Sequence, residues 1–235
     1  MATHGEIKMI IKLSNVLKFY AAKPHQDKAI AFLQANIDAA VMAKFAELWR
    51  AEPKLETKQL ITMQQATAIF LRSPSAKQLL DLNACLVRFE ITTHKRMRQF
   101  LPQIGHESGG LQWMQEIATG DAYEWRRDLG NVKPGDGRKY KGAGAIQLTG
   151  RANYQAFADH MNDQRIMQGS EFVAAEYPFT SAGFWWMMNG INSLVDAGAN
   201  VEQISRMVNL GGANGTIRGL GDRLAYYARA SKVFG

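Results

Sequence analysis

Apolar residues recur at three- and four-residue steps along most of this chain, which is the spacing of helices that bury one face. The stretch DKAIAFLQANIDAAVMAKFAELWR, residues 27–50, follows this pattern, and Pro24 is suited to the first turn of its helix. The apolar stripe of this stretch consists of Ile30, Leu33, Ile37, Val41, Phe45 and Leu48. The same spacing predicts helices over residues 63–71, 75–89, 94–107, 151–161, 181–195, 200–209 and 221–234.

Two interruptions organise the chain. The polar stretch 50–59 contains Pro53 and breaks the helical period, so we expect a boundary near residue 57. It divides an N-terminal helical segment, 1–57, from a main domain, 58–235; the segment could pack on the domain, bind the target or add solubility. Between Gly120 and Gly150 glycine, aspartate and isolated aromatic residues predict loops and at most short strands. The fold class is therefore mainly α, with one long irregular stretch that is expected to be functional.

Composition narrows the class of protein. With 235 residues, 46% of them hydrophobic, the chain can bury a substantial core. A formal charge of +7 favours anionic partners such as nucleic acid, lipid headgroups or bacterial wall glycans, without choosing among them. Cys85 is the only cysteine, which excludes an intramolecular disulfide and is more typical of a core residue than of a nucleophile. We see neither a signal peptide nor a membrane span, which predicts synthesis in the cytoplasm.

The stretch QIGHESGGLQWMQE, residues 103–116, holds two carboxylates nine residues apart. In one unbroken helix Glu107 and Glu116 would lie on opposite faces, about 13 Å apart along the axis. Gly109 and Gly110 are expected to end the helix and let the chain reverse, so that Glu116 can fold back toward Glu107. The alternative is that these glutamates are only the irregular end of a surface helix.

Glu107 is placed where its ionised form is disfavoured. The negative end of the helix dipole and the apolar neighbours Ile104 and Leu111 would both favour a retained proton. A protonated carboxyl beside an ionised one is what hydrolysis of a glycosidic bond requires. Two other interpretations fail on spacing: Ser108 lacks the glycine two residues before it that a nucleophile elbow needs, and Gly110 stands where a zinc peptidase has its second histidine. No metal site and no cofactor are predicted.

A second group of candidate residues lies in RKYKGAGAIQLTGRANY, residues 138–154. Gly142 and Gly144 would allow close approach of backbone to a ligand, and other side chains offer hydrogen bonds or flat faces for sugar rings. These side chains are Gln147, Thr149, Asn153, Tyr140 and Tyr154. The alternative is a short strand followed by a helix cap at Thr149 or Gly150.

The ordered set HESGG with a glutamate nine residues on, YKGAGAIQLTGRANY, GFWWMMNG, MVNLGG and GDRLAYYARA resembles the family 19 glycoside hydrolases, from about residue 58 to the C-terminus. That family includes plant and bacterial chitinases and many phage endolysins. The resemblance implies a lysozyme-like helical domain with two lobes and a central cleft, and inversion at the anomeric carbon. Inversion requires carboxyl groups about 6.5 to 9.5 Å apart.

The resemblance also implies a role for each matching residue. Glu107 matches the general acid, Glu116 the general base, and Thr149 the hydroxyl residue that helps to hold the attacking water. The matching substrate-binding positions are His106, Tyr140, Gln147, Asn153, Asn209 and Arg223, the last of these an arginine behind the acid pair. Glu124 is the alternative base, because some members place theirs farther along the loop.

Three positions depart from the usual pattern of the family. Ala143 and Ala145 replace an arginine and a proline, which removes one basic contact and some loop stiffness, and Ser108 replaces a commoner threonine. The loop DAYEWRRDLGNVKPGDGRKYKG, residues 121–142, most resembles that of phage endolysins. We expect a monomeric enzyme that binds peptidoglycan glycan strands, with no nucleic acid and no stable membrane insertion. It would be made in the host cytoplasm and released to the wall by a separate membrane protein. A chitinase and an inactive wall-binding protein are the alternatives.

Overall fold

The computed structural model describes residues 59–235, and the predicted N-terminal segment, 1–57, lies outside these residues. The described chain is mainly helical, with single bridging pairs at Gln115–Ala143 and Ala143–Leu148 in place of extended strands. Its α-helices are α3 (Met63–Phe70), α4 (Ala76–Arg88), α5 (His94–Glu107), α6 (Asp136–Lys139), α7 (Arg151–Met161), α8 (Ser170–Glu176), α9 (Thr180–Met188), α10 (Ile191–Asp196), α11 (Val201–Leu210) and α12 (Leu220–Phe234). Short 3₁₀ turns are η2 (Asp121–Tyr123), η3 (Arg127–Leu129) and η4 (Gln164–Gln168).

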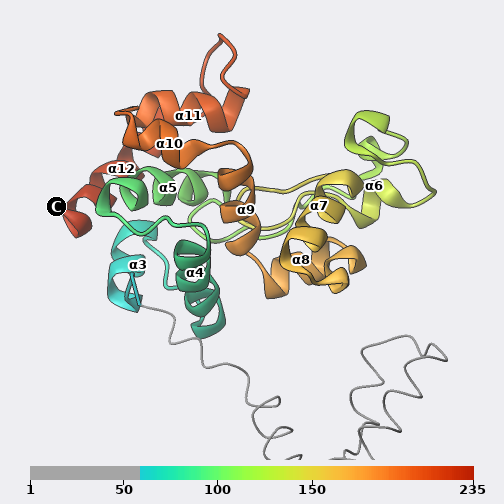
Figure 1. The fold of residues 1–235 in the computed structure, drawn as a ribbon, viewed down its shortest axis with the longest axis horizontal. Coiled ribbons are helices and arrows are strands. Elements are labelled where there is room, and N and C mark those ends of the chain that lie inside the picture. Colours follow the sequence, from blue (N-terminus) through green and yellow to red (C-terminus); the bar gives the residue numbers. More distant parts are fainter. Residues whose placement is uncertain (1–58) are drawn as a thin grey trace, which may run out of the picture. The chain divides into compact units, whose positions relative to one another are not determined.

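Helix α5 is the centre of the larger group of helices. It contacts α3, α10, α11 and α12, and Figure 1 shows it between the α10–α11 pair and the α3–α4 pair. Phe100, Leu101 and Ile104 are fully buried on it. Gly105 lets α12 approach closely, because a Cβ there would lie 2.8 Å from the Tyr226 ring. The residue at the end of α5 is therefore held by a well-packed support.

A second group of elements comprises η2, η3, α6, α7, η4 and α8. Contacts join α7 to η4 and η3, α8 to η4, and α6 to η2, and Figure 1 shows this group to one side of α5 and α9. The stretch that leaves α5 at residue 108 runs into this group, and α9 leads the chain back from it. The two groups correspond to the two lobes that the sequence predicts.

Local sequence signals explain most helix bounds. Thr62, Ser75, Thr93 and Asn200 each accept a hydrogen bond from the backbone N–H three residues on, as N-caps do. The predictions for 94–107 and 151–161 agree with α5 and α7 residue for residue. The predicted helix 181–195 is instead two helices, because Gly190 adopts a φ of 62° and ends α9. Helices α6 and α8 were not predicted.

Cys85 is a core residue, as its isolation in the sequence indicates. Cys85 is fully buried on α4, which packs against α9. A Cβ at Gly183 of α9 would lie 2.6 Å from the Cys85 Sγ. Burial raises the pKa of the Cys85 thiol well above its usual range, which disfavours the reactive thiolate. Within 59–235 no helix is long and apolar enough to cross a bilayer.

The second lobe is stabilised by a buried ion pair. Asp136, whose side chain is 2% exposed, accepts from the guanidinium of Arg151 and from the backbone N–H groups of Val132 and Lys133, both at 2.9 Å. These contacts lower the pKa of Asp136 to about 2, with the Arg151 hydrogen bond the largest cause. The irregular loop is thereby fixed to the first turn of α7.

Asp136→Asn should therefore destabilise the domain, by about 2 kcal/mol at neutral pH. The folded-state pKa is lowered, so the contribution of Asp136 is present above the unfolded value near 3.8 and is lost as pH falls from about 4 to about 2. Urea unfolding of the parent and the variant should show a difference that shrinks over this interval. A constant difference between pH 7 and pH 2.5 would contradict the assignment.

Candidate active site

Helix α5 ends just before the paired glycines, as predicted, and a turn follows it. Gly109, Gly110 and Leu111 have φ values of 58°, 67° and 69°, so three successive residues are in the left-handed region. The N–H of Gly110 donates to the carbonyl of Gly105 at 2.8 Å, which closes the end of the helix. Buried Ser108 joins both sides of the turn, because its Oγ donates to Ile104 O at 2.6 Å and accepts from Leu111 N at 2.9 Å.

Glu107 is the last residue of α5, and its side chain is 25% exposed. The fully buried guanidinium of Arg223, on α12, donates to its Oε1. Among the described residues no group bonds its Oε2. The carboxyl is therefore held at one oxygen by the guanidinium, and its second oxygen has no hydrogen-bond partner in the described part of the chain.

Glu116 lies in the short extended segment after the reversal. Its backbone N–H donates to Gly142 O at 2.9 Å, and its Oε2 accepts from Gly142 N at 3.0 Å. Its Oε1 accepts from the hydroxyl of Tyr123 at 3.0 Å. Desolvation and the bond to Glu116 raise the pKa of the Tyr123 phenol, so it remains a donor at neutral pH. Neutral donors thus bind both oxygens of Glu116 and fix the orientation of its carboxyl group.

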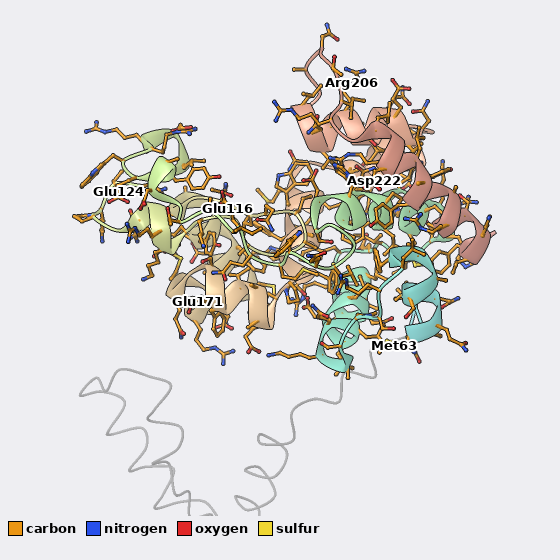
Figure 2. The ribbon with its side chains drawn as sticks, turned by 180° about the vertical axis from the view of Figure 1, so that it is seen from behind. Met63, Glu116, Glu124, Glu171, Arg206 and Asp222 are labelled. Atoms are coloured by element: carbon orange, nitrogen blue, oxygen red, sulfur yellow. The ribbon has the colours of Figure 1, made fainter. Side chains whose placement is uncertain are left out.

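Glu124 is engaged elsewhere. Its two carboxylate oxygens accept from the backbone N–H groups of Gly135 at 2.7 Å and Gly137 at 2.8 Å, at the start of α6. Figure 2 shows Glu124 within the outer loops of the second lobe and Glu116 nearer the middle of the domain. Glu124 therefore holds the backbone at the start of α6, which is a structural role. This engagement favours Glu116 as the base.

Known proteins and solved structures resemble this chain in sequence and in fold. A glycosyl hydrolase family 19 domain-containing protein of Haemophilus influenzae is 28% identical, in an alignment covering 49% of this chain and 70% of that protein. Chitinase C from Streptomyces griseus HUT6037 matches the fold with a TM-score of 0.60 at 18% identity, over 75% of this chain and 77% of that chain. A family 19, class IV chitinase from Zea mays gives a TM-score of 0.59 at 16% identity, over 74% and 92%. No family model matches the chain.

The resemblance to glycoside hydrolase family 19 is confirmed. The predicted fold class, a mainly helical lysozyme-like domain, is confirmed with it. The roles assigned to individual residues remain predictions, and the contacts of each residue bear on them separately.

The second group of candidate residues, within 138–154, lies beside Glu116. A Cβ at Gly142 would lie 2.6 Å from Gln147 Oε1 and 3.1 Å from Glu116 Oε2, so this glycine lets both side chains meet the backbone. The Thr149 hydroxyl donates to Gln147 O at 2.8 Å, which leaves its oxygen free to accept from a water. Exposed Asn153 donates to Thr149 O at 2.7 Å. Gly144 serves packing instead, since a Cβ there would lie 2.0 Å from Ser181 Oγ.

Tyr140 does not have the predicted role. Its side chain is buried, with the residue 1% exposed, and its ring is covered by Tyr154 and by the Arg151 guanidinium, 4.7 Å from its centroid. Tyr154 is fully buried as well, and its hydroxyl donates to Lys141 O at 2.7 Å. Neither ring can stack on a sugar, because both are buried between α6 and α7.

His106 and Asn209 lie on either side of the loop before α12. His106 Nδ1 is 2.7 Å from Asp222 Oδ2, and its ring rests on Gly219, where a Cβ would lie 1.9 Å away. Asn209 Oδ1 accepts from Arg218 N at 2.9 Å. Both contacts hold the loop that precedes Arg223 in the chain. They therefore help to fix the position of Arg223 beside Glu107.

Two residues near the glutamates were not predicted from the sequence. Tyr123 bonds Glu116 although it lies in the loop beside Glu124, and its only signal was an aromatic hydroxyl in a functional stretch. Trp113, 45% exposed, lies on the reversal between the two glutamates and offers the kind of flat face on which sugar rings stack. Within 59–235 no cluster of three His, Cys, Asp or Glu side chains could hold a metal ion.

Glu116→Gln and Glu124→Gln should separate the base from the loop carboxylate. Loss of the base should lower kcat about 100-fold or more. Glu124→Gln should mainly lower the melting temperature, because a neutral amide holds the N–H groups of α6 less well. Hydrolysis rates and thermal unfolding of both variants test this. An inactive, fully stable Glu124→Gln beside an active Glu116→Gln would reverse the assignment.

Tyr123→Phe should impair the base without removing it. Loss of one donor destabilises the Glu116 carboxylate, so the acidic limb of the kcat profile should move to higher pH. At neutral pH the fall should be modest, about 3- to 10-fold, which corresponds to one hydrogen bond. Tyr227→Phe on α12, whose hydroxyl has no described hydrogen bond, is the matched control. Identical profiles for the two variants would remove Tyr123 from the site.

Proposed function

We propose that this protein hydrolyses β-1,4 glycosidic bonds of bacterial peptidoglycan as an endolysin, by an inverting acid and base mechanism. The observation that carries the proposal is that the two carboxyls, one on each side of the turn after α5, have different hydrogen-bond partners. Glu107 has one oxygen on Arg223 and one free, whereas both oxygens of Glu116 accept hydrogen bonds. At the coarser level the family 19 relationship supports a chitinase-like glycosidase.

The proposed reaction uses each group once. Glu107 gives its proton to the glycosidic oxygen as the bond from that oxygen to the anomeric carbon breaks. A water attacks the anomeric carbon from the opposite face, and Glu116 takes the proton of this water. Thr149 Oγ can accept a hydrogen bond from the second O–H group of the water. Arg223 stabilises the negative charge that Glu107 acquires when its proton leaves.

Charge supports peptidoglycan as the substrate. Peptidoglycan carries carboxylates on its peptide stems, whereas chitin is neutral, and the chain has a formal charge of +7. The loop of residues 121–142 exposes Arg127, Lys133 and Lys139. Chitin is the second candidate, because the solved structures that match this fold are chitinases.

Purified peptidoglycan and chitin should be digested side by side, with mass spectrometry and NMR of the released fragments. We expect faster release from peptidoglycan and a new reducing end in the α configuration, the inverted form of a β linkage. Release from chitin alone would replace the proposed substrate by the second candidate. A β reducing end in the first product would exclude inversion.

Glu107→Gln should abolish release from both polymers, by about 100-fold or more, because the amide has no proton to give. Glu171→Gln on α8 changes an exposed carboxylate far along the chain and is the matched control, with activity equal to the parent (Figure 2). A parent chain that binds wall fragments without cleaving them would identify an inactive wall-binding protein.

A further inference from the structure

A buried series of hydrogen bonds joins α11 to Glu107 through α5 and α12. Ser205 Oγ donates to Val201 O at 2.6 Å and lies 3.1 Å from Gln103 Nε2. Gln103 Oε1 accepts from Arg223 Nη1 at 2.6 Å, and Arg223 Nη2 donates to Glu107. Gln103, Ser205 and Arg223 are each fully buried.

The donors and acceptors of this series allow one orientation of the Gln103 amide. Ser205 has a single hydroxyl hydrogen, which is used on Val201 O, so its oxygen must accept from the Gln103 NH₂ group. The Gln103 carbonyl oxygen then faces Arg223, whose guanidinium can only donate. A reversed amide would place NH₂ against the guanidinium and leave both groups without acceptors. Arg223 and Ser205 together therefore fix which atom of Gln103 meets the arginine.

Helix geometry places Gln103 and Glu107 on one face. They are four residues apart on α5, and the single guanidinium spans both side chains. The other contact of the guanidinium is long, from Nε to Arg218 O at 3.5 Å, and contributes little. Without Gln103 the ion pair with Glu107 itself would be the only short contact of the guanidinium among the described residues.

We propose that Gln103, oriented by Ser205, is a positioning residue that holds Arg223 against Glu107 and so fixes the free oxygen of the acid. The kinetic part of this inference rests on the proposed hydrolase function. Gln103 reaches no substrate, because it is fully buried, and it acts only through Arg223. His106, which precedes Glu107 on α5, and its partner Asp222 on α12 are titratable groups near this end of the helix, and the variants below leave both unchanged.

Gln103→Met keeps the length of the side chain and removes the acceptor. We expect kcat to fall about 10- to 100-fold with KM within about 2-fold, since a misplaced acid slows the chemical step rather than binding. A weaker Arg223 contact would also let Glu107 keep its proton to higher pH, so the alkaline limb of kcat should move upward. Ser205→Ala, which loosens the amide without removing it, should give a smaller change in the same direction.

Two further variants distinguish positioning from general stability. Gln99→Met is the matched control one turn earlier on α5, because Gln99 is also buried but its amide makes only a long contact, 3.4 Å to Ala199 O. It should leave kcat and the pH profile unchanged. Gln103→Glu keeps an oxygen for Arg223, so its kcat at the optimum should exceed that of Gln103→Met, while its competing charge also moves the alkaline limb upward.

A readout independent of activity separates this inference from the proposed function. Carbon-13 NMR of the Glu107 carboxyl, followed against pH, should show a higher midpoint in folded Gln103→Met than in the parent and in Gln99→Met. Equal midpoints in all three would overturn the positioning role. A parent without hydrolase activity but with the expected midpoint shift would overturn the proposed function and leave the positioning of Glu107 by Gln103 standing.

Discussion

The site depends on the reversal that follows α5. A helix continued through residue 116 would separate the two glutamates by about 13 Å along its axis and turn them to opposite faces. Instead, Gly109, Gly110 and Leu111 take positive φ in succession. Space as well as conformation requires glycine at 110, where a Cβ would lie 2.9 Å from Tyr226 Oη and 3.0 Å from Phe70 O. The turn is thus packed against α12 and the end of α3, and cannot relax into another helical turn.

The two carboxyls after and before this turn are held in different ways. Glu107 is on the last turn of the best-supported helix in the domain, and a buried cation from α12 fixes one of its oxygens. Glu116 lies beyond the turn, and neutral donors from two loop positions bind both of its oxygens. The proposed division into acid and base rests on this difference.

The features that could be predicted from the sequence are those that depend on residues close together in the chain. Periodicity with a capping threonine predicts α5, and the paired glycines predict the reversal, because each depends on residues close in the chain. The division of 181–195 at Gly190 was missed although Asn-Gly is a turn signal, since the apolar residues around it continue the helical spacing. The burial of Tyr140 could not be predicted, because it depends on Arg151 and Tyr154 of the following helix. Gln103 was likewise hidden: its partners, Ser205 and Arg223, lie 102 and 120 residues further along the chain.

The long irregular loop can hold Tyr123 against Glu116 because polar contacts give the loop the order that a core would otherwise supply. Asn131 is fully buried; it donates to Tyr123 O at 2.8 Å and accepts from Arg151 N at 2.8 Å. The Arg151 guanidinium in turn binds Asp136, which holds two further loop N–H groups. Tyr123 is therefore tied to the first turn of α7 through the Asn131 side chain. Carboxylates that look like rival catalytic groups in the sequence, Glu124 among them, order the loop so that one phenol reaches Glu116.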